Sequence, residues 1–146
     1  MKFSIELIIN ESRNEVWDKF DSVENLYKWQ PTLTEFNHKS GEAGQPGARS
    51  GLKYRERNRD YEMIETITSR NKPAEFSGTY EMKGTKNSIK NKFTELGKNQ
   101  TKWELDSEFE FSGIYKLMSP FMKGMMVKRT KTDMNRFKDL VEGNLE

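Results

Sequence analysis

One carboxylate of this sequence stands where it could do chemistry. Glu65 falls on the apolar face of a predicted strand, near Tyr54 and Tyr80 and opposite Gly78, whose missing side chain leaves space on the sheet surface. A carboxylate there can hydrogen-bond a ligand hydroxyl or amine, and burial would raise its pKa towards that of a general base. Alternatively, Glu65 is structural, either solvated near an open end or paired with a tyrosine. Glu56 lies closer to its hairpin turn, and we expect it to be exposed.

Other polar residues share this apolar face. Asn91 and Ser107 interrupt it, and an unsatisfied buried polar group costs about 1–3 kcal/mol, so both need hydrogen-bond partners. A ligand or a cavity water is one possible partner, and a bond between the two side chains is the other. Tyr54, Tyr61 and Tyr80 either orient a ligand through their hydroxyls or pack within the sheet.

A methionine-rich segment lies at the start of the C-terminal helical pattern, and it includes Met118 and Met122. Methionine adapts to irregular apolar shapes, so the segment suits a promiscuous pocket or an ordinary core. Pro120 predicts a break or a late helix start near Ser119–Pro120. If the helix is broken there, the segment is the natural gate to a cavity.

Several classes of site are excluded by composition and spacing. The chain has no cysteine, which excludes disulfides and thiolate nucleophiles. His38 is the single histidine and is predicted at the surface, and a metal site or a catalytic triad needs more such groups. The glycines at positions 41, 44, 47 and 51 match no phosphate-binding motif. We therefore predict neither a metal site nor a cofactor.

Length and composition indicate one folded domain. The 146 residues suffice for one core, and the 12% of aromatic residues indicate a packed interior despite 33% charged residues. The net charge of +2, with both signs mixed, argues against nucleic-acid binding. No apolar run approaches the roughly 20 residues of a membrane span, and no signal peptide is evident, so we expect a cytoplasmic protein. We assign residues 1–144 to the domain and interpret 145–146 as a tail left by cloning.

The first third of the chain predicts a strand, two short helices and a second strand. Residues 3–9 alternate between apolar and polar, which is typical of a strand. Ser12 and Glu15 form a capping box that predicts a helix start, because Ser12 can bond the third helical amide while Glu15 reaches back. A second helix over 24–29 stops before Pro31, and a strand follows at 33–38.

The middle of the chain, from 52 to 111, predicts successive antiparallel hairpins with one apolar and one charged face. We place turns at Asn58-Arg59, near Asn71-Lys72-Pro73, at Gly84-Thr85 and about Lys98. Three hairpin registers follow from these turns: Arg57 opposite Asp60; Phe76, Gly78 and Tyr80 opposite Phe93, Asn91 and Ile89; and Trp103 and Leu105 opposite Phe93 and Asn91.

The last element is a long helix that covers the sheet. Its apolar residues from 114 to 141 recur at helical spacing, and we interpret Trp17, Trp29 and Trp103 as anchors of the core. The predicted solvent side of the helix carries Lys128, Arg129, Lys131, Arg136 and Lys138. A long helix laid across a curved antiparallel sheet, with two short helices after the first strand, is an α+β domain.

This order of elements resembles the helix-grip fold of the START/Bet v 1-like (SRPBCC) superfamily, and specifically its bacterial polyketide cyclase/dehydrase-like branch. The residues that carry the likeness are Asn14–Phe20, Val23–Pro31, Gly44–Arg49 and Asp133–Glu142. Ser12-Arg13 replaces the proline-containing helix start common in relatives, which should leave the fold intact. The resemblance implies a sheet of about seven strands wrapped around the C-terminal helix, with a cavity between them.

Three functions remain open, because this superfamily contains binding proteins, enzymes and co-chaperones. The first is binding of a small hydrophobic molecule (a lipid, a polyketide or an aromatic metabolite) in the cavity. The second is a cyclase or dehydratase that uses Glu65 with Tyr54 or Tyr80 as an acid/base pair. The third is a protein-interaction module, with no particular partner indicated. The predicted cavity wall consists of Tyr54, Met63, Glu65, Tyr80, Asn91, Leu105, Met118 and Met122.

Overall fold

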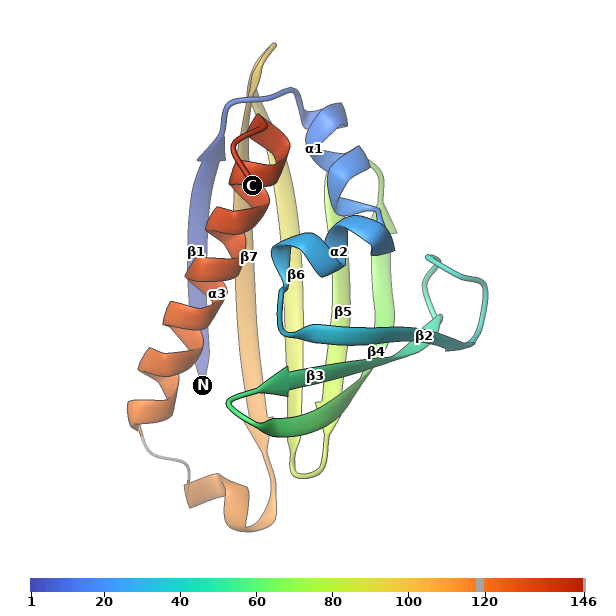
Figure 1. Ribbon diagram of the computed structural model, residues 1–146, viewed down its shortest axis with the longest axis vertical. Coiled ribbons are helices and arrows are strands. Elements are labelled where there is room, and N and C mark those ends of the chain that lie inside the picture. Colours follow the sequence, from blue (N-terminus) through green and yellow to red (C-terminus); the bar gives the residue numbers. More distant parts are fainter. Residues whose placement is uncertain (118–119, 146) are drawn as a thin grey trace.

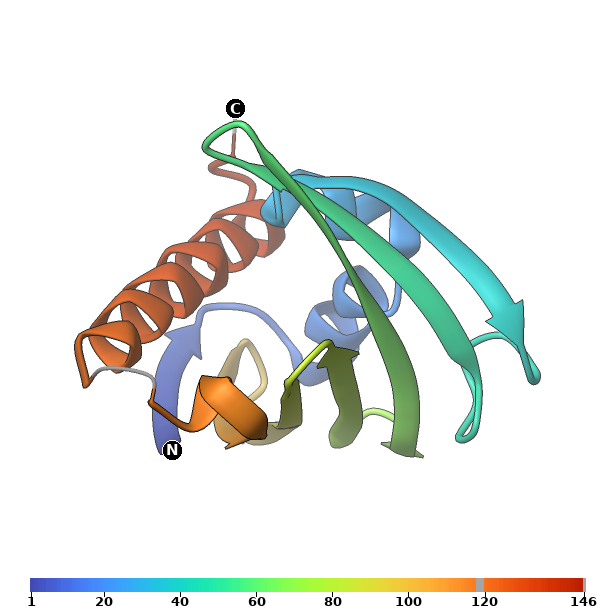
Figure 2. The ribbon, with the colours of Figure 1, turned by 90° about the horizontal axis from the view of Figure 1, so that it is seen from below.

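The sheet and the helix that it grips dominate the structure (Figures 1 and 2). The computed structural model describes residues 1–117 and 120–145, except for the side chains of 117, 120 and 121. Within these residues, seven antiparallel strands lie in the order β1-β7-β6-β5-β4-β3-β2. The strands are β1 (Lys2–Ile9), β2 (Leu33–Ser40), β3 (Arg49–Glu56), β4 (Arg59–Asn71), β5 (Glu75–Met82), β6 (Thr85–Gly97) and β7 (Gln100–Phe111). The helices are α1 (Arg13–Phe20), α2 (Val23–Trp29), the 3₁₀ helix η1 (Gly113–Leu117) and α3 (Pro120–Glu142).

The two short helices begin at serine caps. The hydroxyl of Ser12 accepts the amide of Glu15 at 3.3 Å, so the predicted start of α1 is confirmed. The amide of Ser12 donates instead to the neighbouring Glu11 side chain at 3.0 Å, which replaces the reciprocal bond expected from Glu15. Ser22 caps α2 in the same way, through the amide of Asn25 at 3.1 Å. These caps satisfy helix amides that would otherwise lack partners.

The predicted faces of the sheet are right, but two of the three predicted hairpin registers are wrong by two residues. The β6–β7 pairing is confirmed, with Trp103 opposite Phe93 and Leu105 opposite Asn91. The other two hairpins pair Tyr54 with Tyr61, Arg55 with Asp60, Phe76 with Asn91, Gly78 with Ile89 and Tyr80 with Asn87. A shift of two residues keeps each side chain on its face, because side chains alternate with a period of two.

The turns explain both register errors. The β3–β4 turn is formed by Arg57 and Asn58, which both adopt positive φ angles (52° and 65°), as two-residue hairpin turns with the twist of the sheet require. In the β5–β6 turn, Gly84 (φ 77°) is the second central residue and not the first. Each turn is therefore centred one residue earlier than predicted, which shifts the pairing by two.

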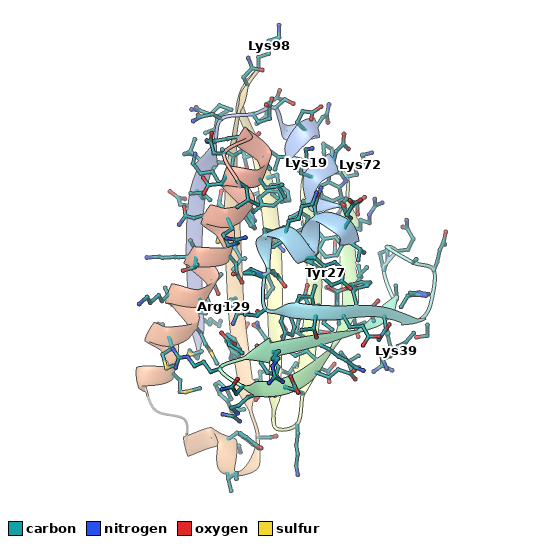
Figure 3. The ribbon with its side chains drawn as sticks, in the orientation of Figure 1. Lys19, Tyr27, Lys39, Lys72, Lys98 and Arg129 are labelled. Atoms are coloured by element: carbon teal, nitrogen blue, oxygen red, sulfur yellow. The ribbon has the colours of Figure 1, made fainter. Side chains whose placement is uncertain are left out.

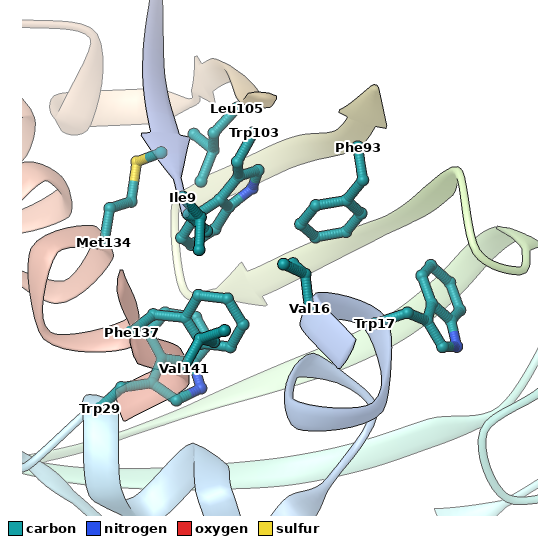
Figure 4. Close-up of a cluster of buried hydrophobic side chains, with 10 residues drawn as sticks. All are labelled: Ile9, Val16, Trp17, Trp29, Phe93, Trp103, Leu105, Met134, Phe137 and Val141. Atoms are coloured by element: carbon teal, nitrogen blue, oxygen red, sulfur yellow. The ribbon is translucent and has the colours of Figure 1, made fainter. Parts of the chain in front are cut away.

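Aromatic packing fills the end of the molecule where α1, α2 and the last turns of α3 meet the sheet (Figure 4). Trp17, Trp29 and Trp103 are all buried, as predicted. The ring of Phe137 on α3 lies 5.0 Å from Trp103 and 5.3 Å from Trp29. Such edge-to-face pairs add about 0.5–1.5 kcal/mol beyond the burial of apolar area, so this cluster anchors α3 to the sheet.

α3 begins at Pro120, and the predicted late helix start is confirmed. Met134, Phe137 and Val141 form its buried stripe, and Gly143 follows its last residue with a positive φ of 80°. None of the helices in the described part of the chain is long and apolar enough to cross a membrane. The α+β architecture, with a seven-stranded curved sheet gripping one long helix, agrees with the predicted fold.

Candidate functional site

Glu65 lies buried on the inner face of β4, with only 7% of its surface exposed. The hydroxyl of Tyr80, directly across on β5, donates to Glu65 Oε2 at 2.8 Å. The expectation that Gly78 stands opposite Glu65 is wrong, because Gly78 pairs with Ile67. A Cβ at Gly78 would lie 3.1 Å from the backbone oxygen of Thr66 on β4 and at ordinary contact distance, 3.6–3.7 Å, from Tyr80, so the tightest neighbour of the glycine is the backbone of the adjacent strand.

The electrostatics of this pair follow from its burial. Burial raises the pKa of Glu65, and the hydrogen bond from Tyr80 opposes that rise without cancelling it. Burial and the nearby Glu65 charge raise the pKa of Tyr80 well above its ordinary value, so the tyrosine keeps its proton. The arrangement is a neutral tyrosine donating to a carboxyl of increased basicity. Such a carboxyl can accept a hydrogen bond or a proton from a molecule placed against it.

Tyr54 extends the polar patch towards α2. Its hydroxyl donates to Gln30 Oε1 at 2.9 Å, and its ring stacks on Tyr61 with centroids 5.3 Å apart. Burial raises the pKa of Tyr54 far above its ordinary value. The side chain is therefore a rigid, protonated wall whose hydroxyl is already used by Gln30.

Arg129 ties α3 to the strands on the far side of the site (Figure 3). Its guanidinium bonds Glu56 of β3, and it reaches Thr32, just before β2, at 2.5 Å and Asp133 of its own helix at 3.2 Å. Tyr61 donates to the second oxygen of Glu56 at 3.1 Å. One side chain thus joins the helix to the β2–β3–β4 part of the sheet.

This connection corrects two predictions. Arg129 does not lie on the solvent side of the helix, and Glu56 is half-buried where we expected it to be exposed. The signal for Arg129 was its spacing, because it falls three residues after Met126 and four before Asp133, within the inward stripe of the helix. A charged residue in that stripe required a buried acidic partner, and Glu56 provides it.

The remaining predicted wall residues fall into two places. Met63 packs with Tyr54, Leu33, Leu52 and Tyr80 in a second, smaller apolar cluster, and Met122 is half-buried on α3. Leu105 and Asn91 lie among the large aromatic core residues instead. Met118 falls outside the described residues. The structure therefore brings Tyr54, Met63, Glu65 and Tyr80 together, and it separates Asn91 and Leu105 from them.

The inward polar groups of Asn91 and Ser107 have protein partners. Asn91 accepts the indole N–H of Trp103 at 3.0 Å and donates to the Phe76 carbonyl at 3.3 Å. Ser107 donates to Asn87 at 2.9 Å. Asn91 and Ser107 do not bond each other. Their partners are other protein groups, which neither predicted alternative (a ligand or water, or a bond between the two side chains) had named.

The inner face changes character along the sheet. Phe93, Trp103 and Leu52 are almost completely inaccessible, whereas Met63, Tyr80 and Ile89 are half-buried although their side chains point to the same face. Phe109 and Phe111, near the end of β7, are also half-buried. Solvent therefore reaches parts of the inner face, and Glu65 lies next to one of them, directly opposite Tyr80.

The described residues offer neither a metal centre nor a buried polar site on the outer face of the sheet. Within the described residues, no group of three His, Asp or Glu side chains is arranged to hold a metal ion, and His38 is exposed. An open groove of about 500 Å³ crosses the outer face of the sheet, where small hydroxyl side chains such as Ser4, Ser77, Thr79 and Ser88 line it. It holds no buried titratable group, so the inner face is the better candidate.

Comparison with known families identifies the fold. A family model described as "Polyketide cyclase / dehydrase and lipid transport" matches residues 1–142. The chain belongs to this family. The family lies in the START/Bet v 1-like (SRPBCC) superfamily and is known for ligand binding and for polyketide cyclase activity. A search of curated protein sequences finds no significant match.

Solved structures of this superfamily share the whole fold. The crystal structure of Ara h 8.0201 is 17% identical, covers 99% of each chain and gives a TM-score of 0.81. A START superfamily protein from Mycobacterium smegmatis is 13% identical, covers 97% of each chain and also gives 0.81. The Zhui aromatase/cyclase from Streptomyces sp. R1128 is 10% identical, covers 100% of this chain and 96% of its own, and gives 0.80. At these identities the similarity shows the fold alone.

Proposed function

We propose that the chain binds a small, largely apolar molecule between the inner face of the sheet and α3, with a hydrogen-bond donor of the ligand against Glu65. The observation that carries this proposal is the position of a buried carboxylate beside an inner face that solvent still reaches. Apolar side chains such as Met63 and the ring of Tyr54 supply the contact area, and a few polar groups orient the guest. Lipids, polyketides and aromatic metabolites that carry a hydroxyl or an amine fit this description.

The hydrogen-bond arrangement favours a donor on the ligand. Among described residues, the only hydrogen bond of the Glu65 side chain is the one that Oε2 accepts from Tyr80. A carboxylate can accept several hydrogen bonds, so Oε1 has capacity for a ligand. A bond to a charged acceptor contributes about 1.5–3 kcal/mol, against about 0.5–1.5 kcal/mol for a neutral one. Ligands with a hydroxyl should therefore bind better than otherwise similar ligands without one.

The test compares 2-naphthol with 2-methoxynaphthalene, which lacks the donor, by isothermal titration calorimetry at pH 7.5. We expect the wild-type protein to prefer 2-naphthol by about tenfold or more, and Glu65→Gln to reduce that preference below about tenfold. Glu62→Gln is the matched control, because Glu62 lies exposed on the outer face of the same strand. Equal preferences in the wild type and Glu65→Gln would contradict the proposal. Native mass spectrometry of protein from its own host, followed by solvent extraction, would then identify the natural ligand.

The Glu65–Tyr80 pair also supports a second candidate, an enzyme of the cyclase or dehydratase type. A carboxyl with a raised pKa, bonded to a tyrosine that retains its proton, has the parts of an acid/base pair. In this case Glu65 accepts a proton from the substrate, and the tyrosine holds the carboxylate in place. Once the natural ligand is known, Glu65→Gln separates the candidates: lost turnover with retained binding indicates an enzyme, and absence of turnover in the wild type indicates a binding protein.

A further inference from the structure

Large apolar side chains are exposed at the end of the molecule opposite the aromatic core. Ile114 of η1 is 79% exposed, Met125 in the first turns of α3 is 46% exposed, and Met82 at the end of β5 is 42% exposed. Exposed apolar residues scattered singly need no explanation, whereas a group of them on one end indicates an interaction surface.

These segments form one continuous end of the fold (Figure 1). The amide of Ser112 donates to the Gly84 carbonyl at 3.0 Å, and a Cβ at Gly84 would lie 2.0 Å from the ring of Tyr115. The β5–β6 turn and η1 are therefore packed directly against each other, and α3 begins three residues after η1 ends. We call this end the basic tip and define it by Met82, Lys83, Ile114, Lys116, Lys123, Met125 and Lys128.

Cations accompany the apolar residues. Lys83, Lys116, Lys123 and Lys128 are all exposed, and none forms an ion pair with a residue that the structure describes. Residues 111–132 contain four lysines, one arginine and no carboxylate, whereas the whole chain carries a net charge of only +2. Two carboxylates on the neighbouring strands, Glu81 of β5 and Glu110 of β7, stand on either side of Lys86 of β6. The segment 111–132 therefore carries excess positive charge even though Arg129 is paired with Glu56 and Asp133, and the rest of the chain is net acidic.

We propose that the basic tip docks onto the surface of an anionic lipid bilayer. Apolar side chains next to lysines suit such a surface, because the apolar groups enter the boundary of the acyl chains while the ammonium groups contact the head groups. The apolar residues project from three separate segments, which fits insertion into a fluid layer. The inference is independent of the ligand proposed for the inner face.

The test is flotation with vesicles of phosphatidylcholine alone and with vesicles containing about 30% phosphatidylglycerol. The wild-type protein should float with the anionic vesicles only, and added salt should weaken binding. The double variant Lys116→Gln/Lys123→Gln should reduce the partition coefficient about 25-fold, because each lysine near the membrane surface contributes about fivefold. Ile114→Ser should reduce it about tenfold.

The matched control removes two lysines elsewhere. Lys72→Gln/Lys98→Gln changes the net charge equally, and both residues lie away from the basic tip, with Lys98 at the opposite end (Figure 3). The vesicle binding of this control should stay within about twofold of the wild type. Circular dichroism checks that each variant is folded. Equal loss in the two double variants, equal binding to both vesicle types, or capture of an acidic protein without vesicle binding would each overturn the proposal.

Discussion

Replacing Tyr80 with phenylalanine removes the hydrogen bond to the buried carboxylate and nothing else of similar size. The bond is 2.8 Å long, and Glu65 is only 7% exposed. With the carboxylate ionised, the bond is charge-assisted and contributes about 1.5–3 kcal/mol. With the carboxyl protonated, the bond becomes neutral and contributes about 0.5–1.5 kcal/mol. The cost of Tyr80→Phe should therefore depend on the protonation state of Glu65.

The sign follows from the raised pKa of Glu65. The folded protein holds a proton that the unfolded chain releases, so this group contributes stability at low pH that is lost as pH rises through the folded pKa. Without the Tyr80 hydroxyl, which opposes the rise, the pKa goes higher and the loss at high pH becomes larger. Tyr80→Phe should lower the free energy of unfolding by about 1.5–3 kcal/mol at pH 8 and by about 0.5–1.5 kcal/mol at pH 4.

Thermal unfolding followed by circular dichroism measures this difference. An unfolding entropy of about 2.1 cal/mol/K per residue gives about 0.3 kcal/mol/K for 146 residues, so Tm should fall by about 5–10 °C at pH 8 and by about 2–5 °C at pH 4. Tyr54→Phe is the control, because its hydroxyl donates to the uncharged Gln30 and its loss should be the same at both pH values. If both variants lose the same Tm at both pH values, a charge-assisted bond from Tyr80 to an ionised Glu65 at pH 8 is refuted.

Three further substitutions test the surroundings of the site. Arg129→Met removes the hydrogen bonds to Glu56, Thr32 and Asp133 and should lower the free energy of unfolding in urea by about 1–3 kcal/mol. Hydrogen exchange should accelerate in β3 and β4, and unchanged exchange there would argue against the connection. Trp103→Phe leaves Asn91 Oδ1 without its donor and should destabilise by at least about 1–3 kcal/mol, part of which Asn91→Leu should recover in the same background. Gly84→Ala is strained at φ 77° and collides with Tyr115, so limited proteolysis should cut η1 faster, whereas Gly97→Ala, with open space around it, should behave as the wild type.

The arrangement of the fold was predictable because it depends on periodicity. Alternation in β1, the serine cap at Ser12 and the proline at the start of α3 each predict a local feature, and each is found. The partners across two hairpins were not predicted correctly, because pairing depends on which residues take positive φ. Arg57 and Asn58 do so in one turn, and Gly84 takes the second central position in the other.

The site was predictable only in part. The inward position of Glu65 and its closeness to Tyr80 survive a register error of two residues, because both side chains stay on the same face. The partner of Tyr54 was not predictable, since Gln30 reaches it from the end of α2, and no local pattern relates the two residues. Arg129 was missed because charged helix residues are usually exposed, and its partner Glu56 is distant in sequence.

The position of a bound ligand tests the central claim most directly. Nuclear magnetic resonance of methionine methyl groups, recorded during a titration with 2-naphthol, reports on the inner face, the packed core and the tip of the molecule. We predict shifts for Met63, on the inner face of β4, and for Met122, half-buried on α3, and none for Met82 at the tip or for Met134 in the packed core. Shifts confined to Met82, or saturable binding that leaves Met63 and Met122 unchanged, would contradict a ligand held between the sheet and α3.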